Sequence, residues 1–344
     1  MFARTFLLLF LTCALFAPQG APAAEGAPSL RVTLLLEHEG DDAWTTMLKR
    51  GLSRAEREFG LTAKIVTAGP ETDQTEIFRK AARESDFVLL ASDAFHEILR
   101  DNAANFRHVK FGCIDAGIRG PNIQCITFAD EQAAYLAGTA AAMLAKSGRA
   151  GAASPNGPAI GWLSGADVAA LRSLFNGFNE GAAAAAPGIR VLHGCTDSFT
   201  DVEAGRREAR RLISQGVTVL ALAAGPANKG ALEEARMAGI SVIGLDADQS
   251  AVWPGHVLTS IVKNVDEAAY ELTAAAATGN FKGKRIDVWD LKKGVAIVPP
   301  ERSMGAKTPL LADISRRMEE LRREFASGGI HLKSLRAKTL CDCL

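Results

Sequence analysis

Polar side chains stand where several apolar, β-rich runs of this sequence end, and most of them are carboxylates. The runs before Asp93 and Asp246 both read as buried strands, and Gly225 lies at the end of a third. An ionised carboxylate only accepts hydrogen bonds, whereas a glycine lets the backbone itself approach a ligand. Further polar residues at strand ends are Glu37, His38, Ser92, Asp115 and Asp248. Because ligands bind at the carboxyl ends of strands in open α/β sheets, these residues predict a binding cleft.

Motifs for catalysis and for cofactors are missing from the same strand ends. The first loop reads Glu37-His-Glu-Gly-Asp-Asp-Ala-Trp44, without the Gly-x-Gly-x-x-Gly of a dinucleotide site, and no P-loop follows any strand. Gly161-Trp-Leu-Ser-Gly165 lacks the spacing of a nucleophile elbow. The six histidines are scattered, with no metal-ligand spacing. We therefore expect a protein that is not an enzyme and that has no cofactor and no metal.

The elements that would position these residues alternate between strand and helix. After the run Val32–Glu37, apolar residues between Trp44 and Phe59 recur at spacings of three and four, which is one face of a helix. The alternation continues to Phe128 and restarts with an alanine-rich helix at Glu131–Lys146. Near-continuous apolar strands indicate parallel sheets covered by helices on both faces. Two such series predict two doubly wound α/β lobes.

The length of the chain agrees with two lobes, and its charges balance. The chain has 344 residues, more than a single core usually holds. Its 39 basic and 39 acidic residues give a formal net charge of zero. A nucleic-acid binder would carry a basic excess, so nucleic acid is not an expected partner.

Residues 1–23 read as a cleavable signal peptide. Arg4 supplies a positive charge, Phe6–Phe16 form a short apolar run, and Ala21-Pro-Ala23 offers small residues at a cleavage site. The run is shorter than the roughly 20 residues that span a bilayer, so export to the periplasm is favoured over a membrane anchor. A lipid anchor at Cys13 is not expected, because Thr12 stands where a lipobox has a small residue.

Cysteines beyond the signal peptide have two open interpretations. Cys113 and Cys125 lie on successive expected strands, and in an oxidising compartment they could pair or stay free. Cys341 and Cys343 stand alone near the C-terminus, which is too little to indicate a metal site.

Three stretches of the sequence together carry a family resemblance. They are Glu131-Gln-Ala-Ala-Tyr-Leu-Ala-Gly138, then Ser198-Phe-Thr-Asp201, then the pair Ile243-Gly-Leu-Asp-Ala-Asp-Gln249 and Leu258-Thr-Ser-Ile-Val-Lys-Asn264. The pair is the most specific of the three. Through these stretches, and over most of residues 30–333, the chain resembles the basic membrane protein family of solute-binding proteins, which includes purine-nucleoside receptors.

The resemblance implies a type I periplasmic-binding-protein fold, with doubly wound parallel-sheet lobes joined by a three-crossing hinge. We place the N-terminal lobe at residues 29–127 plus 256–283, the C-terminal lobe at 128–255 plus 284–333, and a tail at 334–344. The implied function is capture of a purine nucleoside or related solute by hinge closure, and its delivery to the separate permease and ATPase of an ABC importer. The chain is expected to act as a monomer. The alternatives are a ligand-sensing subunit that presents its solute to a membrane receptor and, less favoured by the missing motifs, an α/β enzyme.

The resemblance also implies site residues. Asp246 matches an aspartate that accepts hydrogen bonds from sugar hydroxyls. Lys263 matches a lysine that reaches a sugar oxygen and neutralises that aspartate, although a structural ion pair at the lobe crossing is an equal reading. Phe199 matches one of two aromatic residues that sandwich the base, and Trp44 occupies the region of the other; each could instead be core.

The loop before Trp44 departs from the family pattern. Nucleoside binders tend to have an aspartate and an asparagine or serine just before the aromatic residue, whereas this chain has Asp41 and Asp42 followed by Ala43. Either aspartate could accept a hydrogen bond from a base N–H, and either could cap the helix that follows. The departure leaves the identity of the ligand less defined than its class.

Overall fold

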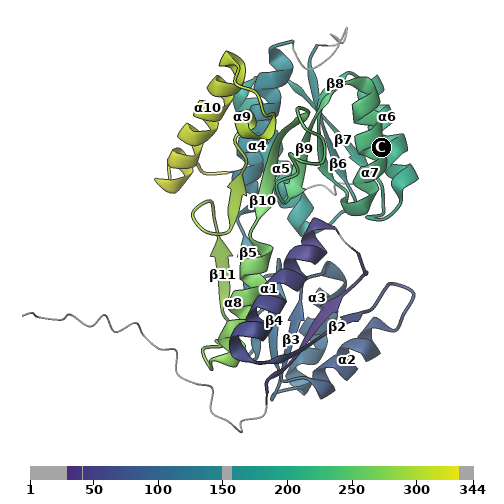
Figure 1. The fold of residues 1–344 in the computed structure, drawn as a ribbon, viewed down its shortest axis with the longest axis vertical. Helices are drawn as coiled ribbons and strands as arrows, with labels where there is room; N and C mark the ends of the chain where they lie inside the picture. The colour runs from purple at the N-terminus through teal and green to yellow at the C-terminus, as the bar shows by residue number, and fades with distance from the viewer. Residues whose placement is uncertain (1–28, 41, 149–156, 333–344) are drawn as a thin grey trace, which may run out of the picture.

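The protein has two lobes, each built around a β-sheet with helices on both faces (Figure 1). The computed structural model describes residues 29–40, 42–148 and 157–332. The predicted signal peptide, Cys13, Asp41, the tail at 334–344 and its two cysteines lie outside the described residues. The predicted α/β class with two sheets is confirmed within the described ranges.

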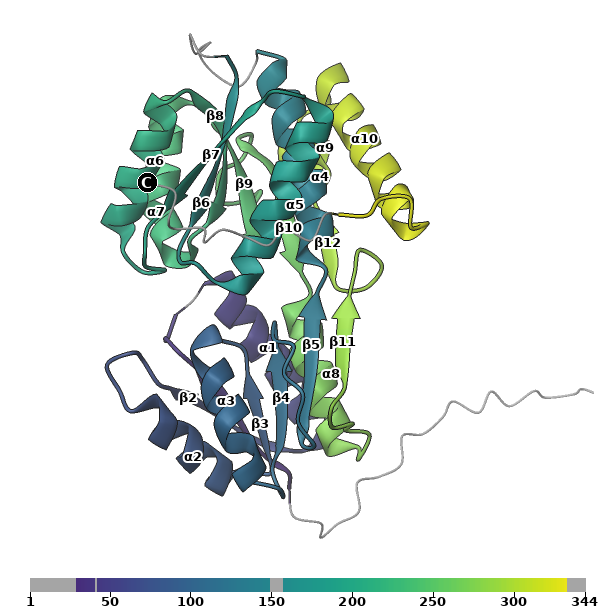
Figure 2. The same cartoon turned by 180° about the vertical axis from the view of Figure 1, so that it is seen from behind.

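The N-terminal lobe has a six-stranded parallel sheet in the order β11-β5-β4-β3-β1-β2. Helices α1 and α8 cover one face, and α2 and α3 cover the other (Figure 2). All four residues of β3 are buried, as expected of a strand with a helix layer on each side. The elements are β1 Arg31–Leu36, α1 Ala43–Phe59, β2 Thr62–Thr67, α2 Gln74–Glu84, β3 Phe87–Leu90, α3 His96–Asn102, β4 Lys110–Ile114, β5 Ile123–Phe128, α8 Val265–Ala277 and β11 Ile286–Trp289, with 3-10 turns at Asp93–Phe95 and Ala103–Asn105.

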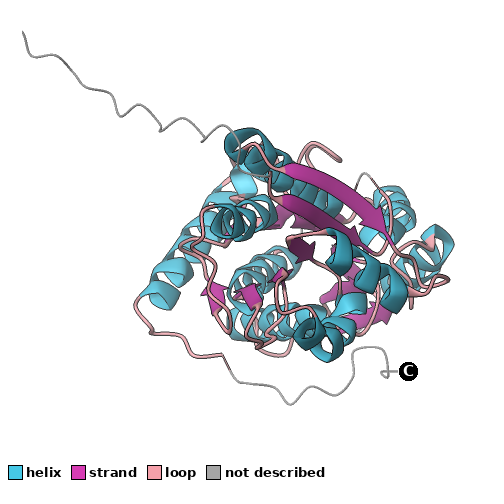
Figure 3. Cartoon of the chain, turned by 90° about the horizontal axis from the view of Figure 1, so that it is seen from below, coloured by secondary structure: helices cyan, strands magenta, loops and turns pink. Residues whose placement is uncertain are grey.

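The C-terminal lobe repeats this plan with the strand order β12-β10-β9-β8-β6-β7, in which β12 alone is antiparallel to its neighbour. Helices α4 and α5 cover one face and α6 and α7 the other. Seen from below, the whole chain has strands at its outer edge as well as between helices (Figure 3). The elements are α4 Asp130–Lys146, β6 Ala159–Ser164, α5 Ala169–Ala185, β7 Arg190–Cys195, α6 Val202–Ser214, β8 Val217–Ala223, α7 Asn228–Ala238, β9 Ser241–Asp246, β10 Val257–Lys263, β12 Val295–Ile297, α9 Pro300–Ser303 and α10 Pro309–Ala326, with a 3-10 turn at Gly225–Ala227.

The chain passes between the lobes three times, and two of these crossings come later than we predicted. The first follows β5, close to the predicted boundary at residue 128. The second follows Lys263 rather than residue 255, because β10 pairs in parallel with β9 of the C-terminal sheet. The third follows Trp289 rather than residue 283, because β11 pairs with β5 of the N-terminal sheet. Both strands are short, and their apolar pattern does not specify which of the two sheets they join.

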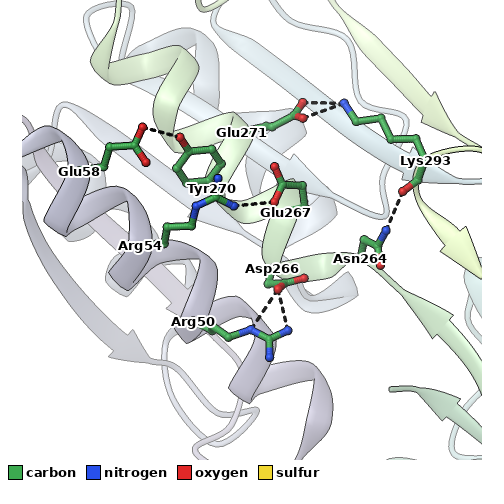
Figure 4. A network of polar contacts seen from close by, with 9 residues as sticks. All are labelled: Arg50, Arg54, Glu58, Asn264, Asp266, Glu267, Tyr270, Glu271 and Lys293. Atoms are coloured by element: carbon green, nitrogen blue, oxygen red, sulfur yellow. Dashed lines mark hydrogen bonds and ion pairs between the residues drawn. The ribbon is translucent and has the colours of Figure 1, made fainter. Parts of the chain in front are cut away.

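Helix α8 leaves the second crossing and packs tightly along α1. A Cβ atom at Gly51 would lie 2.1 Å from the carbonyl oxygen of Asp266, so only glycine permits this approach. Arg50 pairs with Asp266 at 2.6 Å beside the contact (Figure 4). At the other side of α8, Lys293 of the third crossing pairs with Glu271 at 2.8 Å. The second and third crossings are therefore tied to each other beside the N-terminal lobe.

Cys113 and Cys125 lie directly opposite each other on β4 and β5. Both are buried free thiols, so of the two readings left open by the sequence the structure has the unpaired one. The neighbouring Cys125 thiol and burial both raise the pKa of Cys113, which keeps this thiol protonated and unreactive in the folded protein.

Candidate ligand-binding cleft

A cleft of about 650 Å³ lies between the lobes, at the carboxyl ends of both sheets. This volume is within the range of about 300–1,000 Å³ that small-molecule sites occupy. Residues that follow β1, β3 and β4 line one wall, and residues that follow β7, β8 and β9 line the other. The predicted site residues brought together here are Asp42, Trp44, Asp93, Phe199, Gly225, Asp246 and Lys263.

Lys263 bridges the two lobes at the base of the cleft. Its ammonium donates to carboxylate oxygens of Asp115, at 2.5 Å, and Asp130, at 3.0 Å. Burial lowers the pKa of Lys263, but the combined attraction of Asp115, Asp130 and Asp246 is larger and holds the pKa above its usual range. The ion pair at the lobe crossing, one of the two readings of the sequence, is thus present, and the charge of Asp246 still attracts the ammonium. Two of the three ammonium hydrogens are used, which leaves one for a ligand.

Asp246 lines the wall of the cleft that the C-terminal lobe supplies. It ends β9 with a φ of 71°, a left-handed conformation that costs a non-glycine residue on the order of 1 kcal/mol and that clusters at ligand sites. Within the described part of the chain, no donor forms a hydrogen bond with its carboxyl. Burial raises the pKa of Asp246 to about 6, against the attraction of Lys263. Hydroxyl or N–H donors of a ligand would strongly stabilise the ionised form of such a carboxyl group.

Phe199 takes its position from two glycines of the C-terminal lobe. A Cβ atom at Gly165 would lie 2.3 Å from Cδ1 of Phe199, so the ring occupies the space that a larger residue would fill. Gly225 has a φ of 55°, and a Cβ atom added there would lie 3.5 Å from Cδ1 of the same ring. The carbonyl of Phe199 accepts a hydrogen bond from the amide of Ala227 at 2.8 Å. Gly225 therefore supports the aromatic ring in addition to lining the cleft.

Trp44 lines the opposite wall, on the first turn of α1. Its indole Nε1 donates to the carbonyl oxygen of Ala91, at 3.2 Å, which fixes the ring relative to the end of β3. The Lys263 ammonium lies 5.2 Å from the ring centroid, within the range of a cation–π contact. Trp44 and Phe199 thus offer one aromatic face from each lobe.

Asp42 is the N-cap of α1, as one reading of the sequence predicted. Its Oδ1 accepts from the amide of Thr45 at 3.0 Å, while Oδ2 lies 3.6 Å from Nε2 of His38. Burial alone would raise the pKa of Asp42, but the His38 and Thr45 contacts outweigh burial and lower it to about 2. Asp42 therefore stays ionised in the cleft wall, where it can only accept hydrogen bonds.

Several cleft residues were missed by sequence reasoning. His96 lies three residues after Asp93, and its Nδ1 approaches Oδ1 of Asp93 at 3.0 Å. This spacing was a local signal that could have been read, whereas Asp130 becomes relevant only through its nonlocal contact with Lys263. The other unanticipated lining residues include Asp197, Asn228 and Gln249.

Carboxylates outnumber cations along the cleft. Among the lining residues that the structure describes, Lys263 is the only lysine or arginine, against the acidic side chains of Glu37, Asp42, Asp93, Asp115, Asp197 and Asp246. A site of this charge repels anionic ligands and favours neutral or cationic ligands that donate hydrogen bonds.

Two facing α/β lobes with a ligand-sized cleft at their strand ends are the architecture of the periplasmic-binding-protein-like fold. Comparison with known families agrees: the family described as Bmp, ABC transporter substrate-binding protein PnrA-like, matches residues 32–318. The chain belongs to this family, whose members are substrate-binding proteins rather than enzymes.

Similar sequences include basic membrane proteins of Borrelia garinii subsp. bavariensis. The chain is 25% identical over 300 residues to basic membrane protein A1 of Borrelia garinii subsp. bavariensis, covering 85% of this chain and 86% of the relative. It is 28% identical over 305 residues to basic membrane protein B of the same organism, covering 84% and 86%.

Solved structures support the same fold. A solute-binding protein of an ABC transporter system from Aeropyrum pernix K1 superposes with a TM-score of 0.76 at 23% identity, covering 90% of this chain and 94% of that one. One from Conexibacter woesei superposes with a TM-score of 0.66 at 21% identity, covering 89% and 99%.

Two further properties concern the described residues alone. In the ranges 29–40, 42–148 and 157–332, no helix combines the length and apolar character needed to cross a membrane. In the same ranges, no group of three or more His, Cys, Asp or Glu side chains is arranged to hold a metal ion.

Proposed function

We propose that this chain is the extracytoplasmic receptor of an ABC importer, and that it captures a purine nucleoside or a related small solute. The chain is exported through its N-terminal signal to the periplasm and acts there as a monomer. Ligand enters between the lobes, which close on it about the three crossings. The closed protein then delivers its ligand to the permease and ATPase chains at the inner membrane.

The observation that carries the ligand assignment is the unpartnered carboxyl of Asp246 at the cleft surface. An ionised carboxylate can accept hydrogen bonds from two neighbouring hydroxyls, which is the pattern that a ribose presents. Lys263 adds a remaining donor for a sugar oxygen. Trp44 and Phe199 supply aromatic faces that suit a flat heterocyclic base.

The charge of the cleft supports a nucleoside over a nucleotide. A phosphate would bring negative charge among the acidic residues that line the walls, with Lys263 already engaged by two aspartates. A neutral ribosyl compound meets no such repulsion and supplies the donors that the carboxylates need.

Thermal-shift screening of the signal-free chain tests this proposal. The probes are purine nucleosides, their 5′-monophosphates, free bases, riboflavin and simple sugars. A nucleoside at a hundred times its dissociation constant stabilises the fold by about 2.7 kcal/mol and raises the melting temperature accordingly. The Asp246→Asn variant, which keeps the side-chain volume, should show no shift. Melting curves that no nucleoside moves would overturn the ligand assignment.

A further inference from the structure

Two buried polar atoms on the N-terminal wall of the cleft have no hydrogen-bond partner among the described residues. They are Oδ2 of Asp42, which lies 3.6 Å from Nε2 of His38 and so just beyond hydrogen-bond distance, and Nε2 of His96; both residues line the cleft. A buried polar atom that is left unsatisfied destabilises the folded protein, so each such atom in a native structure calls for an explanation, and a missing ligand is one. Neither atom belongs to the contacts of Asp246, Lys263, Trp44 or Phe199 described above.

The imidazole of His96 is held in one orientation. Its Nδ1 lies 3.0 Å from Oδ1 of Asp93, and only 15% of the side chain is exposed. A carboxylate oxygen only accepts, so this contact favours the tautomer whose hydrogen is on Nδ1. In the neutral ring, Nε2 then presents a lone pair. Asp42 Oδ2 is an acceptor as well, since this carboxyl is ionised.

We propose that His96 contacts the bound ligand, with its Nε2 accepting a hydrogen bond from an N–H donor on the base. This inference rests on the proposed function. It assigns a contact to the base of the nucleoside, whereas Asp246 is assigned to the ribose. Asp93 is a positioning residue, which acts by orienting the His96 ring. Asp42 Oδ2 supplies a second acceptor on the same wall.

The two acceptors specify the chemical class of the base. Both atoms lie on the same wall and both accept, so a base with two N–H donors suits them, and guanine, with its N1–H and 2-amino group, offers two. A base that lacks these donors leaves the buried acceptors unpaired, and a polar site binds such an analogue much more weakly. Guanosine therefore binds more tightly than inosine, which lacks the 2-amino group, and 1-methylguanosine binds more weakly than guanosine.

Calorimetric titration of guanosine into matched variants tests the role of His96. His96→Asn keeps a polar group near the Nδ1 position and removes the one at Nε2, so affinity should fall by about ten- to a hundred-fold. His96→Gln places an amide near the Nε2 position and should restore most of the loss. The control is His256→Asn, because His256 stacks on Trp253 with ring centroids 4.2 Å apart and does not line the cleft.

The outcomes separate this inference from the proposed function. Guanosine affinity within two-fold of wild type in His96→Asn would overturn the His96 contact and leave the nucleoside assignment intact. Wild-type protein that binds another nucleoside but not guanosine would overturn the donor-edge assignment. Wild-type protein that binds no nucleoside would overturn the proposed function and the His96 contact with it.

Discussion

The ammonium of Lys263 lies 2.5 Å from Oδ2 of Asp115, and this contact joins the two lobes inside the cleft. Asp115 follows β4 of the N-terminal sheet, while Lys263 ends β10 of the C-terminal sheet. Asp130, at the start of α4 just after the first crossing, completes the cluster. The same lysine therefore lies both at the ligand cleft and at the crossing between the lobes.

Loss of this lysine should destabilise the protein strongly. In Lys263→Met the buried carboxylates of Asp115 and Asp130 lose their cation, and breaking a buried pair of this kind costs about 3–5 kcal/mol in the free energy of unfolding. Urea denaturation measures the loss. Lys64→Met is the control, because the Lys64–Glu84 pair is exposed and its loss should change the stability little. Equal losses in the two variants would contradict the role of the cluster.

The pH dependence of ligand binding should follow Asp246. Ligand donors stabilise its ionised form, so binding lowers a pKa that is about 6 in the free protein. Affinity should therefore be level above pH 7 and fall as the pH drops through 6, because protons then compete with the ligand. Calorimetry between pH 5 and pH 8 tests this expectation, and an affinity that rises on acidification would contradict it.

The stability of the free protein should respond to Asp246 with the opposite sign. Its folded pKa of about 6 lies above the ordinary value of 3.8, so its contribution to stability is present at low pH and is lost as the pH rises through 6. Asp246→Asn removes this loss, and unliganded Asp246→Asn should gain stability relative to wild type as the pH rises from 4 to 7.5. Melting temperatures whose difference stays constant over this range would show that the carboxyl is not held in a desolvated state.

Ligand binding should be visible in the fluorescence of Trp44. Stacking of a base on its indole should quench the emission, and Trp44→Phe should lose most of that change while a phenyl ring still stacks on the ligand. Trp253→Phe is the matched control, because Trp253 packs on His256 away from the cleft. A full ligand-dependent signal in Trp44→Phe would assign the response to another tryptophan.

A substitution at Gly165 should weaken ligand binding by moving the Phe199 ring, without removing a hydrogen-bonding group from the ligand site. A methyl group there would lie 2.3 Å from the Phe199 ring and displace it. Gly165→Ala should weaken binding by about tenfold, since base–aromatic stacking is worth about 1–3 kcal/mol. Gly117→Ala is the control, because the nearest atom to its added methyl group is 3.9 Å away. Unchanged ligand affinity in Gly165→Ala would show that ligand binding does not depend on the present position of the Phe199 ring.

Local patterns in the sequence predicted much of the fold and part of the cleft. The α/β series follows from apolar spacing, and Asp93 and Asp246 were found because strand ends converge in parallel sheets. The later crossings were missed because the pairing of β10 and β11 depends on partners far away in the chain. For the same reason, the sequence did not show that Lys263 pairs with Asp115 and Asp130 rather than with Asp246.

The most direct test of the central claim is a calorimetric titration of the signal-free chain with purine nucleosides, beside Asp246→Asn. We predict one binding site per wild-type chain and an affinity at least about a hundred-fold weaker in the variant, the loss expected when ligand donors lose a charged acceptor. Wild-type protein that binds no purine nucleoside, or Asp246→Asn protein that binds one with wild-type affinity, would contradict capture of a nucleoside by this cleft.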